Sequence, residues 1–361
     1  MLFPSFLSLK NPLKPQKKIP FEPIVFDNRQ EKTRDKPSML ILSSTKRNQN
    51  YYRDQALSQQ TYSIAITEQF DFITFQWDVS QIIRIYFDKE PEWIFINYIA
   101  AYTPKLIGFD KINSKVIGFV GDHYNFTDNS EAALQKQAFF KRLSLFAMVS
   151  AYPHTNNIVA KALEKENLPF IHLAWAIDPH IFYDLGKHRK YDIACMGAMT
   201  EGKYPFRRQV REWLEIQKRL KLFKKKRVKG ANKSDHDGIA FNQALNQCRA
   251  AFTCASVMQY TLMKYFEIPA AGTLLFAEET ADLKKLGFRD HIHYIKVTPD
   301  NFQQKMLHYL NPSKQHLAED IRQKGMKFVQ EKHSWPVRIE DFLAELALLD
   351  NGAKHINDKT S

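Results

Sequence analysis

Along most of this chain, short apolar runs alternate with segments of helical spacing, and the alternation starts a second time at Tyr191. The first series includes SMLILSS (38–44) and EWIFINY (92–98), and the second includes YDIACMGAM (191–199) and AAFTCAS (250–256). These runs are continuously apolar, which is typical of strands with both faces buried. Strands that alternate with helices predict a parallel sheet covered by helices. We therefore expect an α/β protein in which two Rossmann-like domains face a cleft.

The same patterns place the remaining elements. Asp78 or Ser80 is expected to cap the first of the helices, and Asn129 or Ser130 another. Further strands are predicted at residues 62–67, 71–77, 114–122, 145–151, 168–175, 224–230, 272–278 and 291–297, and helices at 78–90, 129–143, 154–167, 206–220, 238–249, about 260–271, 279–287, 299–310, 313–333 and 337–349.

A polar, irregular segment, AIDPHIFYDLGKHRK (176–190), separates the two series and is interpreted as a linker. A chain of 361 residues is also longer than one core usually supports, so two domains are expected. The last helix, with Phe342 and Leu346, is expected to pack back on the first domain. The predicted division is a flexible basic tail at 1–36, an N-terminal domain at 37–180, a C-terminal domain at 181–350 and a second tail at 351–361.

The chain carries a formal charge of +13 and a pI of about 9.4, which predicts anionic partners. The segment KRLKLFKKKRVKG (218–230) holds eight basic residues and no acid. It is interpreted either as a solvated helix end with an edge strand, or as a contact for an anionic membrane or acidic acceptor through Lys218–Lys229. Nucleic acid is not expected as a partner, because no RNA-binding motif or finger spacing accompanies the charge.

The three cysteines, Cys195, Cys248 and Cys254, show no metal-binding spacing and are expected to be buried thiols in a reducing compartment. No apolar stretch reaches the roughly 20 residues that span a bilayer. The first residues, MLFPSFLSLKNPLKPQKK, place apolar residues ahead of the charges, which is the reverse of a signal peptide. These features predict a cytoplasmic protein, with the inner membrane face as a second location if the basic segment binds lipid.

The segment KYFEIPAAGTLLFAEE (264–279) raises the question of function. Glu267 is a carboxylate between Phe266 and Ile268, and Lys264 precedes it by three residues on the same predicted helix face. In a parallel sheet, ligands bind at the carboxyl ends of the strands, where a helix start suits a phosphate. The helix after AAFTCAS is therefore expected to bind a diphosphate at its start, with Glu267 accepting hydrogen bonds from sugar hydroxyls. The alternative is a structural pair of Glu267 with Lys264 at the surface.

Several segments resemble the group-one glycosyltransferases, and in particular the branch of spore-maturation-type glycosyltransferases. KYFEIPAAGTLLFAEE is similar to the nucleotide-sugar segment of that branch, which has the pattern Arg/Lys-x-Phe-Glu-x-x-Ala-x-Gly. KYDIACMGAMTEGKYPFRRQVREWL (190–214) resembles its strand–Gly–Tyr-Pro-x-Arg–helix element, and IRQKGMKFVQEKHSWPVRIEDFL (321–343) resembles its closing helices. The resemblance covers residues 170 to 345, and over the first half it concerns mainly the order of strands and helices.

This resemblance implies a B-type glycosyltransferase with the acceptor on the first domain and a nucleotide-sugar donor on the second. Glu267 matches the glutamate that holds the donor ribose. A second acid, eight residues earlier in the wider group, addresses the transferred sugar, and here that position is Gln259. The positions that match the rest of the donor site are Gly197, Tyr204, Arg207 or Arg208, Tyr260 and Lys264. The resemblance further implies retention of configuration and no metal or other cofactor.

Two more clusters carry candidate chemistry. GFVGDHYNF (118–126) ends a predicted strand, so Asp122 could act as a base and His123 could orient the acceptor or the sugar, although an ordinary loop is as compatible with both. Asp235, His236 and Asp237 have metal-ligating side chains, but a loop ahead of a helix is favoured over a metal site.

Three functions therefore compete. The leading prediction is a hexosyltransferase that moves a sugar from a nucleotide donor to a glycan or lipid-linked glycan, as in cell-surface glycan biosynthesis. The alternative is a non-catalytic protein of the same fold that binds a glycan or polyanion, an interpretation that the uncharged Gln259 keeps open. A nucleic-acid-associated protein is the third.

Overall fold

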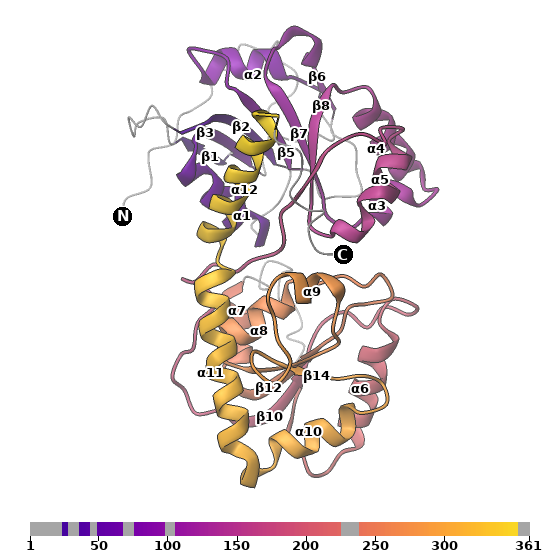
Figure 1. Ribbon diagram of the computed structural model, residues 1–361, viewed down its shortest axis with the longest axis vertical. Helices are drawn as coiled ribbons and strands as arrows, with labels where there is room; N and C mark the ends of the chain where they lie inside the picture. The colour runs from indigo at the N-terminus through magenta and orange to yellow at the C-terminus, as the bar shows by residue number, and fades with distance from the viewer. Residues whose placement is uncertain are drawn as a thin grey trace. The chain divides into compact units, whose positions relative to one another are not determined.

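The computed structural model describes residues 24–27, 36–43, 49–67, 76–97, 105–224 and 238–352 (Figure 1). These residues divide into two compact units. The first unit holds most of the described residues up to Phe170. The second holds those from Ile171 onward, together with the beginning of the first helix and the segment Ser150–Asn156. Each unit is built on its own sheet, which confirms the expected α/β class with parallel sheets.

The sheet of the first unit has seven strands in the order β1-β3-β2-β5-β7-β8-β9. Strand β2 pairs in parallel with β3 and β5, and β5 pairs in parallel with β7. The apolar runs form these strands because their side chains are buried on both faces, as Met39–Leu42 and Ile94–Ile96 are. The strands of this unit are β1 (Ile24–Asp27), β2 (Ser38–Ser43), β3 (Tyr62–Thr67), β5 (Trp93–Asn97), β7 (Lys115–Val120), β8 (Leu145–Ser150) and β9 (Phe170–His172), with a separate pair β4 (Trp77–Asp78) and β6 (Leu106–Ile107).

Two helices of the first unit, α2 and α4, begin at predicted caps. The Asp78 side chain accepts a hydrogen bond from the backbone N–H of Ser80, and Ser130 accepts one from the N–H of Ala133. The helices are α1 (Gln49–Gln60), α2 (Val79–Tyr86), α3 (Tyr124–Thr127), α4 (Glu131–Lys141) and α5 (Asn156–Ala162).

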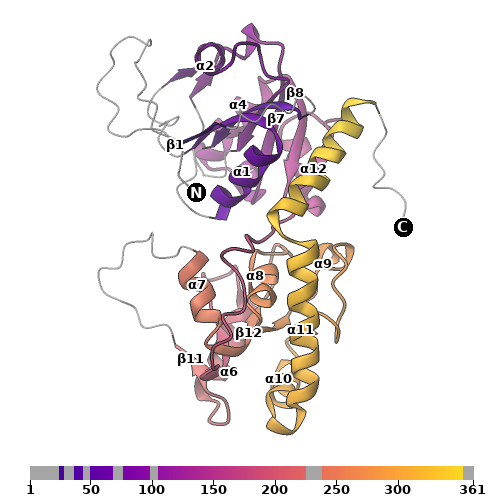
Figure 2. The same ribbon diagram turned by 90° about the vertical axis from the view of Figure 1, so that its left-hand side faces the viewer.

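The sheet of the second unit has five parallel strands in the order β11-β10-β12-β13-β14. Helices α6 and α11 cover its opposite faces (Figures 1 and 2). The strands are β10 (Tyr191–Cys195), β11 (Leu222–Phe223), β12 (Cys248–Thr253), β13 (Leu274–Ala277) and β14 (Ile295–Lys296). The helices are α6 (Pro205–Ile216), α7 (Gly238–Leu245), α8 (Lys264–Ala270), α9 (Ala281–Lys285), α10 (Phe302–Leu310), α11 (Gln315–Lys332) and α12 (Trp335–Asp350).

The strand order of the second unit reverses between β10 and β12. The chain runs from β10 outward to β11 and then returns past β10 to β12, β13 and β14. At such a switch point the loops leave two neighbouring strands in opposite directions and open a crevice at the carboxyl ends of those strands. The residues that follow β10 and β12 are therefore the first place to look for a ligand site.

Two elements differ from the sequence predictions for the first unit. Residues Ile24–Asp27 lie in the segment predicted as a flexible tail, yet they form β1, which pairs antiparallel with β3. The pairing provides hydrogen-bond partners for backbone groups along the edge of β3. The local sequence of residues 24–27 does not show this stabilisation, because it depends on a second strand. Helix α1 was not predicted because its sequence, QNYYRDQALSQQ, is largely polar. Of the predicted strand at 71–77, residues 71–75 lie outside the described ranges.

The predicted helix at about 260–271 is wrong at its start. Helix α8 begins only at Lys264; residues 256–259 form a turn, and residues 260–262 have no regular structure. Ser256 and Gln259 have φ values of 63° and 56°, a left-handed conformation that interrupts a right-handed helix. Glu267 therefore lies in the first turn of α8 and not two turns inside a longer helix.

The predicted linker at 176–190 is irregular, as expected, but it is bonded to the second unit. Arg189 donates hydrogen bonds to the carbonyl oxygens of Cys248 and Ala271 and to the hydroxyl of Thr273. It also pairs with Asp184, whose carboxylate accepts a hydrogen bond from Arg322. The segment is thus fixed by charged and polar contacts that its composition did not show.

Candidate functional site

Three of the predicted donor-site residues meet at the carboxyl end of β10. Gly197 has a φ of 130°, and a Cβ atom built on it would lie 2.9 Å from Nη1 of Arg207 and 3.2 Å from Cε of Lys264. Glycine is required here because a side chain would collide with both cations. The sequence therefore brings Gly197 from a strand end, Arg207 from α6 and Lys264 from α8 into one cationic cluster.

Arg207 is buried, with 1% of its surface exposed. Its Nη1 donates to the carbonyl oxygen of Ala198 at 2.9 Å, and its guanidinium lies 4.1 Å from the ring centroid of Tyr204. Its Nε and Nη2 atoms are buried without a hydrogen-bond partner, and no carboxylate in the described ranges forms an ion pair with it. A buried, unpaired charge is costly, so this arrangement favours an anionic ligand.

Lys264 adds a second cation to the cluster. Its side chain is half-buried, and its Nζ lies 5.6 Å from the centroid of the Phe241 ring. Burial lowers the pKa of this amine, and the nearby Arg207 charge lowers it further, whereas the Glu267 charge opposes the shift. Both cations are thus held where water screens their charges poorly, which strengthens their attraction for an anion.

Glu267 is the buried acid beside this cluster. It is 2% exposed and has Phe266 and Ile268 as neighbours in the chain. Its Oε1 is buried without a hydrogen-bond partner, and burial raises the pKa of the carboxyl to about 7, with the Lys264 charge opposing the shift. The alternative interpretation, a surface ion pair between Glu267 and Lys264, is wrong, because Glu267 is buried. The carboxylate is instead a buried acceptor with a vacant bonding position.

Arg207 and Arg208 were alternatives in the sequence, and the structure separates them. Arg208 is exposed, with 45% of its side chain accessible, and lies 3.8 Å from a carboxylate oxygen of Glu201. The cluster therefore contains Arg207, which α6 directs inward, while Arg208 points to the surface.

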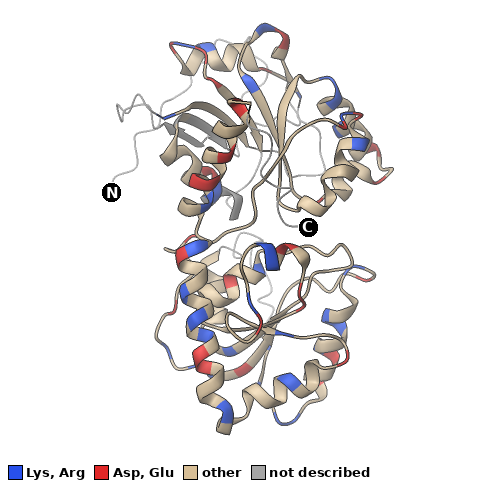
Figure 3. Ribbon diagram, in the orientation of Figure 1, with Lys and Arg blue, Asp and Glu red and all other residues tan. Residues whose placement is uncertain are grey.

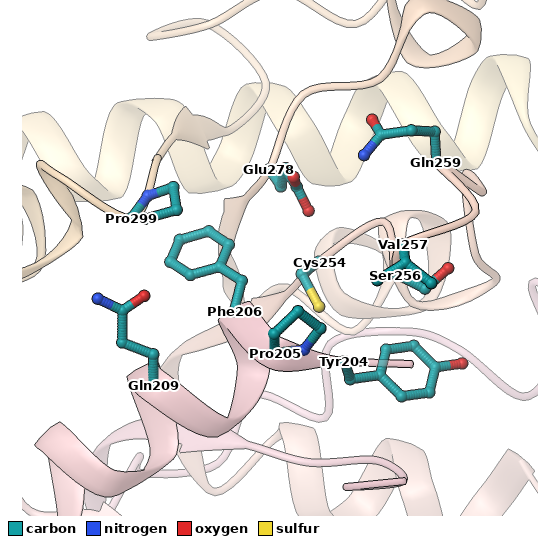
Figure 4. Close-up of a pocket in the computed structure, with 10 residues that line it drawn as sticks. All are labelled: Tyr204, Pro205, Phe206, Gln209, Cys254, Ser256, Val257, Gln259, Glu278 and Pro299. Atoms are coloured by element: carbon teal, nitrogen blue, oxygen red, sulfur yellow. The ribbon is translucent and has the colours of Figure 1, made fainter. Parts of the chain in front are cut away.

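A pocket of about 310 Å³ lies beside Tyr204, at the carboxyl ends of β12 and β13 (Figure 4). The Glu278 carboxylate, which Figure 4 shows near Cys254, accepts a hydrogen bond from the N–H of Ala255 at 2.9 Å. Tyr204 belongs both to this pocket and, through its ring, to the Arg207 contact. The pocket is lined by Tyr204, Pro205, Phe206, Gln209, Cys254, Ser256, Val257, Gln259, Glu278 and Pro299.

The structure places the two remaining donor-site candidates differently. Gln259 is exposed at the pocket. Tyr260 is 3% exposed and stacks on Tyr152, with ring centroids 3.8 Å apart and an interplanar angle of 8°. Tyr260 thus supports the loop, while its neighbour Gln259 presents its amide.

Tyr152 and His154 were missed by the sequence analysis, which assigned His154 to the start of a helix. Nδ1 of His154 lies 3.1 Å from a carboxylate oxygen of Asp282, and Nε2 lies 2.9 Å from the carbonyl oxygen of Met258. The available signal was the position of both residues just after a predicted strand, where functional side chains of parallel sheets gather.

The predicted catalytic residues lie on the first unit, directly after β7. Asp122 accepts a hydrogen bond from the hydroxyl of Tyr124 at 2.9 Å, and His123 precedes α3. Their catalytic roles remain predictions. Asp235, His236 and Asp237 lie outside the described residues, and within the described ranges no group of three or more His, Cys, Asp or Glu side chains could hold a metal ion.

Comparison with known proteins connects this geometry to a family. Residues 182–344 match a family described as glycosyl transferase-like, which covers the cationic cluster, Glu267 and the pocket. A comparison with curated protein sequences found no match. The spore-maturation branch is not identified by these matches and stays a prediction.

Solved structures of similar fold span nearly the whole chain. Sucrose-phosphate synthase from Thermosynechococcus elongatus has a TM-score of 0.53 at 11% identity, covering 88% of this chain and 100% of that one. A glycosyltransferase from Rickettsia africae has a TM-score of 0.53 at 10% identity, covering 90% and 100%. Anabaena HepE in complex with UDP and glucose has a TM-score of 0.54 at 9% identity, covering 86% and 99%.

At these identities the likeness shows the fold, and the family match concerns the second unit. The chain has the two-part α/β fold of the B-type glycosyltransferases, and its residues 182–344 form a glycosyl transferase-like region.

Proposed function

We propose that this protein is a glycosyltransferase that binds a nucleotide-sugar donor on its second unit. The observation that carries the proposal is a pair of buried, incompletely bonded groups, Oε1 of Glu267 and Nε and Nη2 of Arg207, whose charges both act on Lys264. Arg207 and Lys264 would bind the diphosphate, and Glu267 would accept hydrogen bonds from the ribose hydroxyls. A single ligand would then satisfy both buried charges, because its ribose hydroxyls donate to the Glu267 carboxylate and its phosphates accept from the Arg207 guanidinium.

The same residues account for the chemistry that the donor requires. Departure of a nucleoside diphosphate leaves additional negative charge on its terminal phosphate. Arg207 and Lys264 are already held in place by Ala198, Tyr204 and Phe241, so they would stabilise that charge without reorganisation. Two protein cations would supply the role for which other enzymes use a metal ion, which supports a metal-independent transfer.

The finer assignments extend this proposal. HepE, a structure of similar fold, was solved with UDP and glucose, and this supports a hexose donor. We propose a glycan or lipid-linked glycan as the acceptor, bound on the first unit, where Asp122 and His123 would act on it. Retention of configuration is proposed from the resemblance to the group-one families.

Binding of a nucleoside diphosphate without divalent metal tests the proposal directly. Titration calorimetry with UDP, GDP, ADP and TDP in the presence of a chelator is expected to give saturable binding for at least one of them. A thermal-shift series with the same compounds should show stabilisation, because a ligand of the folded state alone raises apparent stability. If none of the four binds, the donor-site assignment is wrong.

A non-catalytic binding protein remains the second candidate, because the position that addresses the transferred sugar holds Gln259, an exposed, uncharged amide. Hydrolysis of the donor separates the two candidates. An enzyme is expected to release nucleoside diphosphate slowly from the nucleotide sugar in the absence of acceptor, whereas a binding protein would return the donor intact.

We further propose that the protein lies in the cytoplasm and contacts the anionic inner face of a membrane. Ile216 at the end of α6 is 78% exposed, and the side chains of Lys218, Lys221 and Lys224 after it are exposed. No acidic side chain of the described ranges forms an ion pair with these lysines. Helix α11, by contrast, carries both basic and acidic side chains (Figure 3). None of the described helices is long and apolar enough to cross a bilayer.

Lys218→Gln is expected to weaken binding to vesicles that contain anionic lipid by about fivefold, since one basic residue near such a surface contributes about 1 kcal/mol. Co-sedimentation with vesicles of phosphatidylserine and phosphatidylcholine measures the effect. Lys327→Gln on α11 removes the same charge from another exposed position and should leave binding unchanged. Equal losses for both variants would point to net charge and would contradict a specific contact.

A further inference from the structure

The segment Ser150–Asn156 holds the residues on both sides of Gln259. Tyr152 stacks flat on Tyr260, at 3.8 Å between ring centroids, and its hydroxyl accepts a hydrogen bond from Nε1 of Trp175 at 2.8 Å. Two residues further on, Nε2 of His154 lies 2.9 Å from the carbonyl oxygen of Met258. The backbone before and after Gln259 is therefore fixed by one short segment, and all of these residues belong to the second unit.

The loop needs this support because its conformation is unfavourable. Ser256 and Gln259 both have positive φ, which costs a residue with a side chain about 1–2 kcal/mol. Backbone hydrogen bonds from Tyr260 to Ala255 and from Val257 to Lys203 hold parts of the loop. Neither of them restrains the Met258 carbonyl, which receives its contact from His154.

The contacts of His154 require an N–H on both ring nitrogens. Nδ1 faces a carboxylate oxygen of Asp282, 3.1 Å away, and Nε2 faces the carbonyl oxygen of Met258. Both partners are acceptors, whereas a neutral imidazole has only one N–H to donate. Both contacts are hydrogen bonds only when the ring is protonated. Loss of the proton leaves one N–H, which stays on Nδ1 because the Asp282 carboxylate is the stronger acceptor, so the contact with Met258 is lost.

We propose that His154 is a positioning residue that, together with Tyr152, fixes Gln259 against the transferred sugar of the donor, and that this contact is released when His154 loses its proton. The proposal rests on the proposed function, since it assigns a role within the same donor site. It predicts that the contribution of the sugar to donor affinity depends on the protonation of His154, whereas the contribution of the nucleotide does not.

The charged groups around His154 give the direction of this dependence. The hydrogen bond with Asp282 raises the pKa of His154, and the Met258 contact adds to the shift against the effect of burial. A raised pKa means that the contact is intact below the ordinary pKa of histidine, about 6.5, and is lost as the pH rises through the higher folded value. His172, which also senses Asp282 as well as Lys285 and Arg338, does not titrate in this range, because burial lowers its pKa to about 4.

Burial raises the pKa of Glu267 to about 7, so this carboxyl also changes its charge near neutral pH, and its effect on binding must be separated from that of His154. Ionisation of Glu267 would strengthen its hydrogen bonds with the ribose hydroxyls. Because a nucleoside diphosphate and its sugar conjugate share this ribose, their affinities would change by the same factor. The ratio of their dissociation constants cancels that contribution. We therefore use each diphosphate, UDP, GDP, ADP or TDP, together with its glucose conjugate as a matched pair of probes, measured by calorimetry between pH 5.5 and 8.5.

In the native protein, the affinity advantage of the glucose conjugate over its diphosphate is expected to fall about fivefold across this range, the effect of one partly exposed hydrogen bond. The His154→Gln variant has no ring that could contact Asp282 and Met258 through two nitrogen atoms. Its affinity for the glucose conjugate relative to the diphosphate should therefore be low and independent of pH, while its affinity for the diphosphate stays native. His316→Gln, an exposed histidine of α11, should behave as the native protein does. The imidazole NMR signals of the native chain, with that of His154 identified by its loss in His154→Gln, should titrate at the pH where the advantage declines.

The outcomes are distinguishable. If a diphosphate binds but His154→Gln keeps the native pH profile of the ratio, or if the variant weakens diphosphate and conjugate equally, the positioning role is wrong and the donor site stands. If the native His154 signal titrates below about 6.5, the protonated contact is wrong, whatever the variant does. If no diphosphate binds at all, the proposed function fails and the role of His154 fails with it.

Discussion

Glu267→Ala is expected to lower the affinity for the nucleoside diphosphate by about tenfold to a hundredfold, because a hydrogen bond to a charged group contributes about 1.5–3 kcal/mol. The fold should survive the substitution, since Oε1 of Glu267 has no partner in the protein that the change would leave unpaired. Calorimetry beside a melting curve separates the two effects. A loss of thermal stability with unchanged nucleotide affinity in the folded fraction would show that Glu267 is structural.

The stability of Glu267→Gln gives an independent check of the same carboxyl group. Burial raises the pKa of Glu267 from 4.5 to about 7, so the folded state binds a proton more tightly than the unfolded state does. The native protein therefore loses stability as the pH rises from about 4.5 to about 7, by roughly 3 kcal/mol. Glu267→Gln, which carries no charge, should match the native protein in free energy of unfolding at about pH 4 and below and exceed it at about pH 8.

If the advantage of the glutamine variant does not grow with pH, burial does not raise the pKa of this carboxyl, and Glu267 is ionised in the folded protein without a cost in stability. A stabilising substitution that weakens nucleotide binding would mean that the native carboxylate is retained at a cost in stability. That is the pattern expected of a binding residue and not of a structural one.

Arg207→Gln is expected to weaken diphosphate binding by about a hundredfold or more. Its Nε and Nη2 are two unpartnered donors, and each charge-assisted hydrogen bond to a phosphate contributes about 1.5–3 kcal/mol. Binding of the nucleoside without phosphates should change little, because the ribose contact assigned to Glu267 remains. Calorimetry with the nucleoside and its diphosphate measures both effects on the same protein.

Arg208→Gln is the matched control, since it removes the same charge from the next residue on the helix. Arg208 is exposed and lies near Glu201, so its removal should leave diphosphate affinity within about twofold, as for a surface ion pair. Equal losses in the two variants would indicate a general effect of basic charge and would contradict the cluster of Gly197, Arg207 and Lys264. An unchanged affinity in Arg207→Gln would exclude that cluster as the phosphate site.

Most of the second sheet was predictable because its strands are buried on both faces. Runs such as that of β13, LLFA, are continuously apolar, and burial on two faces produces this pattern whatever the neighbouring strands are. Strand β1 was not predicted, because its stability depends on pairing with β3 across a separation that the local pattern does not encode. Helix α1 was missed for a related reason, since a largely polar segment shows no helical stripe.

The candidate site was predictable in part. Glu267 and Lys264 are conspicuous in the sequence because they lie among apolar residues. A buried charge is costly, so such a position indicates a functional role. The choice of Arg207 over Arg208 was not accessible, since adjacent residues differ only in the direction that the helix gives them. The late start of α8 was not accessible either, because the loop before it contains two residues of positive φ, Ser256 and Gln259, and makes contacts with Lys203, Tyr152 and His154, which are distant in the sequence.

The sequence by itself determined the α/β class, the two series of strands and the buried acid at Glu267, because each of these follows from local hydrophobic patterns. The tertiary structure decided which charges meet. Gly197, Arg207 and Lys264 are brought together only because β10 and β12 are neighbours at the point where the strand order reverses. His154 reaches Met258 across about a hundred residues of chain, and such a contact depends on packing and not on spacing.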